Sequence, residues 1–291
     1  MHEPGSLADS LQAQLAMLQR FRQTHPYKTA DVGGARWRYL VAGRGEHALL
    51  FLPGAFLRAD MWFCSILTLE DRFRILAPDS FALQDEATGV DAAQASIRLM
   101  QAESIPKATV IGLSAGGGVA QMLVQAYPER VDHLVLSHCG VLESDPAVEA
   151  RLHKFSALAR ILPVTLVRIF LLRRTSGRTP ASSRWCSFTE TYFRQAASAI
   201  DKHVVLRFLG QGLQVRQGTR MRAGTPARWQ GQVLLLSSKD DAITYPSLEK
   251  HQAHYPQART HVFEEGGHHT FMLFPETYTA VLAGFLDEVA R

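Results

Sequence analysis

The sequence predicts an α/β domain with a mostly parallel central sheet, flanked by helices and interrupted once by a helical insertion. Short β-rich runs alternate with helical patterns before residue 140 and again after residue 231, an alternation typical of βαβ units. One long helical stretch separates the two series. The 291 residues are 46% hydrophobic and 20% charged, a globular composition that excludes a disulfide-stapled miniprotein, a collagen-like chain and a disordered tail.

The elements before the insertion follow from apolar periodicity and from turn residues. Leucines at positions 7, 11, 15 and 18 form one stripe of a helix expected over 6–23. Buried strands are expected where short apolar runs end at Pro-Gly, Pro-Asp or Gly-rich turns. The expected strands are 37–41, 48–52, 73–77, 108–113 and 131–137, and the expected helices are 88–103 and 115–127.

The insertion lies between the two series of strands. It is helical and rich in arginine, with one helix expected near 155–173. The strands and helices resume with strands at 233–236 and 259–264 and helices at 246–255 and 275–291. We therefore divide the chain into an N-terminal helical extension packed on the core (1–34), two core parts (35–140 and 231–291) and the helical insertion (141–230).

The insertion is strongly basic, although the whole chain carries a net charge of only +4. Residues 142–230 hold 15 Lys and Arg against five Asp and Glu. Such an excess attracts nucleic acid or an anionic lipid surface, or it is simply a solvated helical face. No aromatic RNA-binding pattern, zinc finger or basic heptad accompanies it, so we expect no nucleic-acid partner and at most a weak membrane-surface contact. No pattern predicts an oligomeric state.

Cysteine usage and the N-terminal residues bear on the compartment. The three cysteines, Cys64, Cys139 and Cys186, are widely spaced and suit a reducing compartment better than a disulfide framework. Residues 1–26 lack the apolar run of a secretory signal, and no run of about 18 apolar residues occurs. We therefore expect a cytoplasmic protein without a transmembrane segment. No cluster of His, Cys and Asp has metal-ligand spacing, so neither a metal nor an organic cofactor is expected.

The sequence from Gly112 to Gly117, GLSAGG, is the sharpest chemical signal in the chain. It follows the strand TVIGL and precedes a helix, so Ser114 is expected on a tight turn with its hydroxyl exposed above the sheet edge. The backbone amide of Ala115 can then donate to a developing oxyanion. A Gly-rich turn with a capping serine is the alternative, but the strand–turn–helix context favours a nucleophile.

This motif resembles the nucleophile elbow of the α/β-hydrolase superfamily, and the resemblance covers roughly residues 35–140 and 231–291. That family has the chain order Ser, then Asp or Glu, then His. The run Val233 to Asp241 is similar to the family's strand and acid loop, which usually has a glycine three residues before the acid. Ser238 stands at that position, and the spacing favours Asp241 over Asp240, which would suit a solvated turn.

The resemblance also points to a histidine near the last helix. The family places Gly-His there with a proline seven residues on, and His268 to Pro275 is that interval. His269 is the rival candidate. The resemblance therefore implies that His268 is the general base and acid and that Asp241 orients it.

A second oxyanion donor is expected in the loop after strand 48–52. The family often reads His-Gly-x there, with a tryptophan farther along, and this chain reads Pro53-Gly54-Ala55 with Trp62. The resemblance implies that the amide of Ala55 is the second donor, beside that of Ala115. Asp79, in a Pro-Asp step after a strand, is expected to brace a loop and not to take part in catalysis.

A serine at the elbow narrows the family's chemistry. Dehalogenase and epoxide-hydrolase members use aspartate there and dienelactone hydrolases use cysteine, so the resemblance implies hydrolysis of a carboxylic ester or lactone through an acyl-enzyme. A carbon–carbon bond hydrolase with the same triad is the first alternative. The second arises because Phe21-Arg22, the run 53–60 and Val119-Ala120-Gln121 are similar to maspardin-like members, a group described as including interaction proteins without a full catalytic set. This chain differs in having candidates for all three triad positions.

By position, the insertion resembles the cap that covers the active site of capped members and sets the substrate's size. The substrate is therefore expected to be a small ester, with an apolar acyl group if the helix near 155–173 lines the pocket. The candidate pocket residues are Phe56, Trp62, His138, Leu166 and Phe170. The alternative is that the apolar face of this helix only packs the insertion on the core.

Overall fold

The computed structural model describes residues 10–84, 92–143, 145–175, 182–218 and 229–290. This part of the chain forms an eight-stranded sheet in the order β1-β2-β4-β3-β5-β6-β7-β8. From β4 to β8 all neighbours are parallel, and β1 and β2 join antiparallel at one edge. The strands are β1 (Lys28–Val32), β2 (Ala35–Ala42), β3 (Ala48–Leu52), β4 (Arg74–Pro78), β5 (Ala108–Leu113), β6 (Val131–Ser137), β7 (Val233–Ser238) and β8 (Arg259–Phe263).

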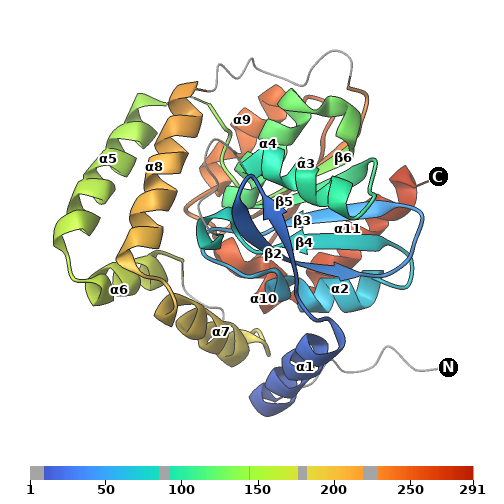
Figure 1. Ribbon diagram of the computed structural model, residues 1–291, viewed down its shortest axis with the longest axis horizontal. Coiled ribbons are helices and arrows are strands. Elements are labelled where there is room, and N and C mark those ends of the chain that lie inside the picture. The colour runs from blue at the N-terminus through green and yellow to red at the C-terminus, as the bar shows by residue number, and fades with distance from the viewer. Residues whose placement is uncertain (1–9, 85–91, 144, 176–181, 219–228, 291) are drawn as a thin grey trace.

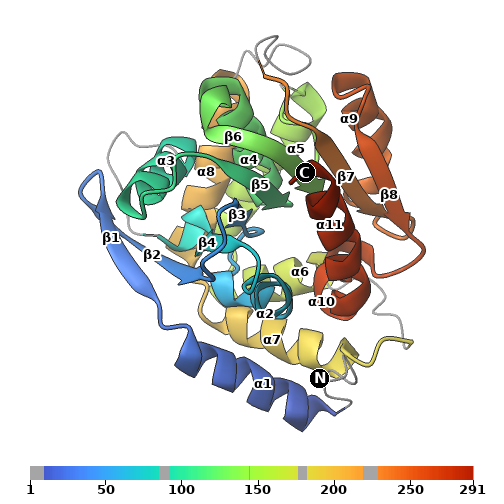
Figure 2. The ribbon, with the colours of Figure 1, turned by 90° about the vertical axis from the view of Figure 1, so that its right-hand side faces the viewer.

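The central strands are mostly apolar and are buried along their whole length, because helices cover both faces of the sheet. Every residue of β3, β5 and β7 is buried, as expected for parallel strands covered on both sides. One core cluster packs α1, α2 and α11 on the sheet, and a second cluster packs α3 and α4 on its other face (Figure 2). The helices outside the insertion are α1 (Leu11–Thr24), α2 (Phe63–Leu69), α3 (Ala92–Ala102), α4 (Ala115–Ala126), α9 (Leu248–His254), α10 (Thr270–Leu273) and α11 (Pro275–Val289).

Four further helices stand between β6 and β7 in sequence and lie to one side of the sheet (Figure 1). They are α5 (Pro146–Ile161), α6 (Val164–Thr175), α7 (Cys186–Ser198) and α8 (Lys202–Gly218). The single helix expected over 155–173 is wrong, because α5 ends at Ile161 and a new helix begins at Val164. Pro163 causes the break, since it has no amide hydrogen and forces Leu162 into an extended conformation.

The α/β fold is confirmed, and several boundaries match: β3, β5 and β6 lie where strands were expected. Two elements were not expected. Residues 28–32, which the sequence places in a purely helical extension, form the edge strand β1; half of this strand is exposed, so it has little apolar pattern. Helix α2 was missed because nearly all of its residues are buried, which removes the helical periodicity.

A buried ion pair joins three parts of the chain that are far apart in sequence. The Arg22 Nε atom in α1 lies 2.7 Å from Asp60 Oδ2, and the Tyr192 hydroxyl in α7 donates to Asp60 Oδ1 at 2.6 Å. The two helices also lie side by side in both views of the ribbon (Figures 1 and 2). The side chain of Asp60 is only 2% exposed, so its charge depends on these partners. The network fastens α1 and α7 to the loop that follows β3.

Replacing Arg22 with glutamine is expected to lower the free energy of unfolding by about 2 kcal/mol, because the buried carboxylate of Asp60 loses its cation. The loss stays below the roughly 3–5 kcal/mol typical of fully buried pairs, since the Arg22 side chain is itself 44% exposed. Urea unfolding measures the change. Arg20→Gln, at an exposed position of the same helix, is the matched control, and equal effects of the two substitutions would contradict this role of Asp60.

Within the described ranges, no helix is long and apolar enough to cross a membrane.

Candidate active site

Ser114 sits on a sharp turn between the end of β5 and the start of α4. Its φ angle of 52° lies in the left-handed region, which a residue with a side chain adopts only where its surroundings enforce it. Close packing of the turn enforces it here: a Cβ added at Gly112 would lie 2.6 Å from the Gly116 carbonyl oxygen, and one added at Gly116 would lie 2.2 Å from the Leu52 oxygen. Glycines at these two positions therefore let the strand, the turn and the helix approach closely enough to present the serine.

The imidazole of His268 faces this serine. His268 lies in a short 3₁₀ turn, Gly267–His269, which follows β8 and leads into α10. Its Nε2 atom is 2.8 Å from Ser114 Oγ, a hydrogen-bonding distance between two residues 154 positions apart in sequence. The backbone before it turns through Gly266 at φ 118°, which glycine adopts readily.

The carboxylate of Asp241 lies behind the histidine. Asp241 Oδ2 is 2.9 Å from His268 Nδ1 and also accepts from the Thr244 hydroxyl, while Oδ1 accepts from the amides of Ile243 (2.9 Å) and Thr244 (3.2 Å). Burial opposes ionisation of Asp241, but the hydrogen bonds and charge of His268 and the donors of Thr244 and Ile243 outweigh it and hold its pKa well below the usual range. Asp241 is therefore a stable anion at neutral pH.

The two rival candidates, Asp240 and His269, make different contacts. Asp240 accepts from the backbone amides of Gly266 (3.2 Å) and Gly267 (2.8 Å), so it holds the loop that carries His268. The ring of His269 is buried and packs on Phe193, with the ring centres 4.1 Å apart. The structure brings Ser114, His268 and Asp241 together, and places neither rival in that chain of hydrogen bonds.

The loop after β3 passes beside the serine. A Cβ added at Gly54 would lie 3.5 Å from the Ser114 Cβ, so the backbone leading into Ala55 runs next to the nucleophile candidate. The following residue, Phe56, has a φ angle of 61°. The loop is held by Asp79, whose Oδ1 accepts from the Ala59 amide at 2.8 Å, the bracing role expected from the sequence.

A cavity of about 990 Å³ opens over these residues, between the core and the inserted helices. Ser114, Ala55, Ala115 and His268 line it on the core side. Its other walls are mostly apolar and come from the loop after β3 and from α5 to α8, among them Phe56, Leu152, Phe155, Phe170, Phe193 and Phe208. Within the described residues, no three His, Cys, Asp or Glu side chains gather as metal ligands would.

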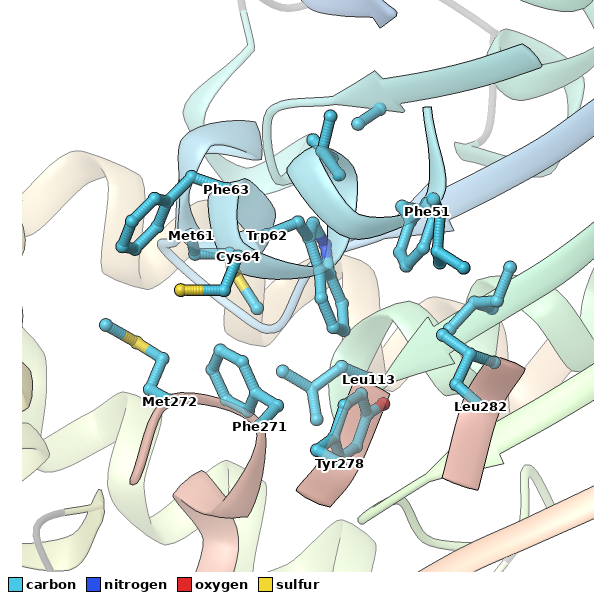
Figure 3. Close-up of a cluster of buried hydrophobic side chains, with 14 of the residues drawn as sticks. Phe51, Met61, Trp62, Phe63, Cys64, Leu113, Phe271, Met272, Tyr278 and Leu282 are labelled. Carbon is cyan, nitrogen blue, oxygen red and sulfur yellow. The ribbon is translucent and has the colours of Figure 1, made fainter. Parts of the chain in front are cut away.

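Two of the five expected pocket residues, Phe56 and Phe170, line this cavity. Trp62 does not: its indole is buried in the core against Phe51 and Phe271, at ring distances of 5.0 and 5.3 Å (Figure 3). Leu166 is 47% exposed, because α6 turns another side, with Val167, toward the protein. These two assignments are wrong, since the sequence does not show which way an apolar side chain faces.

His138 is also not a pocket residue, because it lies fully buried behind His268, with the ring centres 6.3 Å apart. Its Nε2 atom is 2.8 Å from Ser238 Oγ, which in turn is 2.6 Å from the Thr270 hydroxyl beside the His268 loop. This network ties the end of β6 to β7 and to the loop after β8. Burial, with a smaller contribution from the nearby His268, lowers the pKa of His138 to about 3.

Acid is expected to destabilise the protein through His138. The imidazole is neutral in the folded chain but gains a proton near pH 6.5 when the chain is unfolded. Its contribution to the free energy of unfolding is therefore complete above about pH 6.5 and is lost as the pH falls toward about 3. At about pH 5, this group alone lowers the free energy of unfolding by about 2 kcal/mol. His138→Asn, which tolerates the φ of 45°, should show a smaller loss than the native chain when urea unfolding is compared at about pH 7 and about pH 5. Parallel losses in both proteins would contradict this assignment.

The sequence did not single out most of the cavity wall. Phe155, Phe193 and Phe208 come from three different inserted helices and meet only because these helices fold over the core. The spacing of an apolar stripe shows which residues share a helix face, but not whether that face meets the core or the cavity.

The sequence and the fold are similar to those of known proteins. The sequence matches the Alpha/beta hydrolase family over residues 49–282. The chain belongs to that family. The pimeloyl-[acyl-carrier protein] methyl ester esterase of Nitrosomonas europaea is 30% identical over 244 residues, which cover 80% of this chain and 92% of that protein.

Solved structures agree in fold. An esterase from Thermogutta terrifontis has a TM-score of 0.74 at 20% identity, covering 91% of this chain and 98% of that one. The enol-lactonase of Burkholderia xenovorans also reaches 0.74, at 16% identity, covering 89% of this chain and 100% of its own. At these identities the likeness shows the fold alone. The family match over residues 49–282 is what confirms the α/β-hydrolase resemblance of the sequence.

Proposed function

We propose that this protein is a serine hydrolase that cleaves a carboxylic ester or lactone through an acyl-enzyme on Ser114. One observation carries the proposal: the hydrogen-bonded chain from Ser114 through His268 to Asp241 ends at the wall of a large, mostly apolar cavity. The 30% identical relative, an esterase by name, supports the same class of reaction. We also propose a cytoplasmic location, because all three cysteines are free in the structure.

The residues account for both halves of the reaction. A serine hydroxyl is a weak nucleophile, so His268 Nε2 takes its proton as Ser114 Oγ attacks the ester carbonyl. Asp241 holds Nδ1 of that ring and stabilises the imidazolium that forms. His268 then gives the proton to the departing alcohol. In the second half, water attacks the acyl-enzyme with His268 again as base; the bond between the acyl carbon and Ser114 Oγ breaks, His268 returns the proton to Oγ, and the carboxylic acid leaves.

The negative charge on the carbonyl oxygen needs donors that are already in place. We assign this role to the backbone amides of Ala55 and Ala115, which lie on the two segments that flank Ser114. Ala115 is the first residue of α4, where amides point outward and the helix dipole favours an anion. Losing one such donor typically removes about 2.7–4 kcal/mol of transition-state stabilisation.

A substrate panel tests the reaction class. We expect hydrolysis of p-nitrophenyl esters and of simple lactones, and no turnover of a vinylogous diketone. Turnover of the diketone alone would point to a carbon–carbon bond hydrolase with the same three residues. No turnover in the whole panel, together with no reaction with a serine-directed fluorophosphonate, would favour a non-catalytic, maspardin-like interaction protein.

The cavity wall is expected to set the preferred acyl length. Phe170 lines the cavity and stacks near Phe155 at 4.8 Å between ring centres, so Phe170→Ala should change the ratio of kcat/KM between long and short p-nitrophenyl esters by about tenfold. Leu166→Ala, one turn earlier on the same helix, is the matched control: this side chain is 47% exposed and does not line the cavity, so the ratio should stay unchanged. The same profile for both variants would show that α6 does not contact the acyl group.

A further inference from the structure

Five large apolar side chains project from one corner of the inserted helices. Of the eight exposed large apolar residues in the described part of the chain, five lie between positions 158 and 170. We call residues 158–170 the cap tip; it comprises the end of α5, the turn at Pro163 and the first half of α6, at the far end of the inserted helices from α9 (Figure 1). The exposed residues are Leu158, Ile161, Leu166, Ile169 and Phe170, with exposed fractions of 42, 78, 47, 45 and 40%.

Helix α6 turns an apolar stripe outward. Leu166, Ile169 and Phe170 follow the i, i+3, i+4 spacing of a single helix face, and all three are exposed. Val167, about 100° around the helix from Leu166, is fully buried. A helix on the surface of a protein in water normally shows the reverse, with polar residues outside. Ile161 projects farthest, at the turn where the two helices meet.

The two helices of the cap tip are cationic, and beside them the start of α8 adds one charge of each sign, Asp201 and Lys202. Residues 150–175 contain six Lys and Arg and no Asp or Glu. Lys154 and Arg160 are exposed on α5, and Arg168 is half-buried on α6. An apolar tip surrounded by cations is the pattern of a surface that rests on anionic lipid, where the apolar side chains enter the boundary of the acyl chains and the cations meet the headgroups.

The cap tip also borders the cavity. Phe170 is 40% exposed and lines the cavity that holds Ser114. Phe155, its ring neighbour, lines the same cavity. An apolar substrate that leaves a lipid surface at this corner would contact apolar side chains along its path into the cavity.

We propose that the cap tip docks on anionic lipid surfaces, with Ile161 and Ile169 entering the acyl boundary and Lys154 and Arg160 contacting the headgroups. A second copy of the chain fits less well, because a two-fold contact through this corner would bring two cationic surfaces together. An acidic protein would match the charge, but a projecting isoleucine that is 78% exposed suits a deformable lipid boundary better.

The test measures binding to vesicles and needs no ester turnover. The full chain is sedimented with phosphatidylcholine vesicles that contain or lack phosphatidylglycerol. We expect binding only when phosphatidylglycerol is present, and weaker binding as the salt concentration rises. Ile161→Gln/Ile169→Gln and Lys154→Gln/Arg160→Gln should each lower the partition coefficient by about tenfold. Because hydrolysis of a soluble short ester is recorded in parallel, failure of the docking proposal is distinguishable from failure of the proposed function.

The matched control removes similar groups elsewhere. Leu11→Gln/Arg20→Gln takes one exposed leucine and one exposed arginine from α1 and should leave vesicle binding unchanged. The variants' melting temperatures should stay near that of the native chain, since all these positions are exposed. Three results would overturn the proposal: no binding to either vesicle, equal binding by the native chain and the cap-tip variants, or a native dimer in analytical ultracentrifugation that Ile161→Gln/Ile169→Gln converts to a monomer.

Discussion

Replacing Ser114 with alanine is expected to lower kcat for p-nitrophenyl esters by a factor on the order of 10⁴ or more, with the protein still folded. The substitution removes only the hydroxyl group, and the acyl-enzyme cannot form without it. Alanine keeps the Cβ that the strained turn already accommodates, so the melting temperature should stay close to that of the native chain. Steady-state kinetics and a thermal melt on the same preparations measure both quantities.

Ser96→Ala is the matched control for this change. Ser96 lies in α3, where its hydroxyl donates to the Ala92 carbonyl oxygen at 2.7 Å, and it is not one of the residues that line the cavity. This variant should retain native kcat. Activity of Ser114→Ala close to that of Ser96→Ala would show that another residue carries the reaction.

The second large effect is expected at the histidine. His268→Ala should lower kcat by several orders of magnitude, because the imidazole hydrogen-bonded to Ser114 Oγ is the base that takes its proton. His269→Ala should lower it far less. That ring packs on Phe193 and lines the cavity, so its loss is expected to raise KM more than it lowers kcat. The reverse order of the two variants would mean that the hydrogen-bonded chain is not the catalytic one.

The neighbouring carboxylates should differ in the same way. Asp241→Asn removes the anion that fixes the imidazole, an effect on the order of 10⁴ in kcat in serine hydrolases with the same geometry. Asp240→Asn weakens only the bonds from the Gly266 and Gly267 amides, so a smaller loss is expected. Equal losses would show that holding the loop matters as much as holding the imidazole.

The three residues of the hydrogen-bonded chain could be predicted from sequence because each lies at a short local pattern that resembles one of the α/β-hydrolase family. Ser114 is flanked by glycines that the tight turn requires, and Asp241 and His268 each follow a strand at the same edge of the sheet. The carboxyl ends of parallel strands meet at that edge, so local patterns are enough to bring them together.

The cavity wall could not be predicted in the same way. Trp62, His138 and Leu166 are residue types expected in a pocket. Trp62 and His138 are nevertheless buried elsewhere, and Leu166 is exposed. Their positions depend on how the inserted helices rest on the core, which involves contacts between distant parts of the chain. The break at Pro163 is a second example. The proline in the sequence predicts that a helix ends there, but not the direction in which α6 continues.

The most direct test of the central claim is covalent labelling with a fluorophosphonate followed by mass spectrometry of the intact chain and its peptides. We expect one label per chain, located on Ser114, and labelling that is lost in Ser114→Ala and strongly slowed in His268→Ala. An unlabelled native chain that still hydrolyses esters, or a label on any other residue, would contradict that claim.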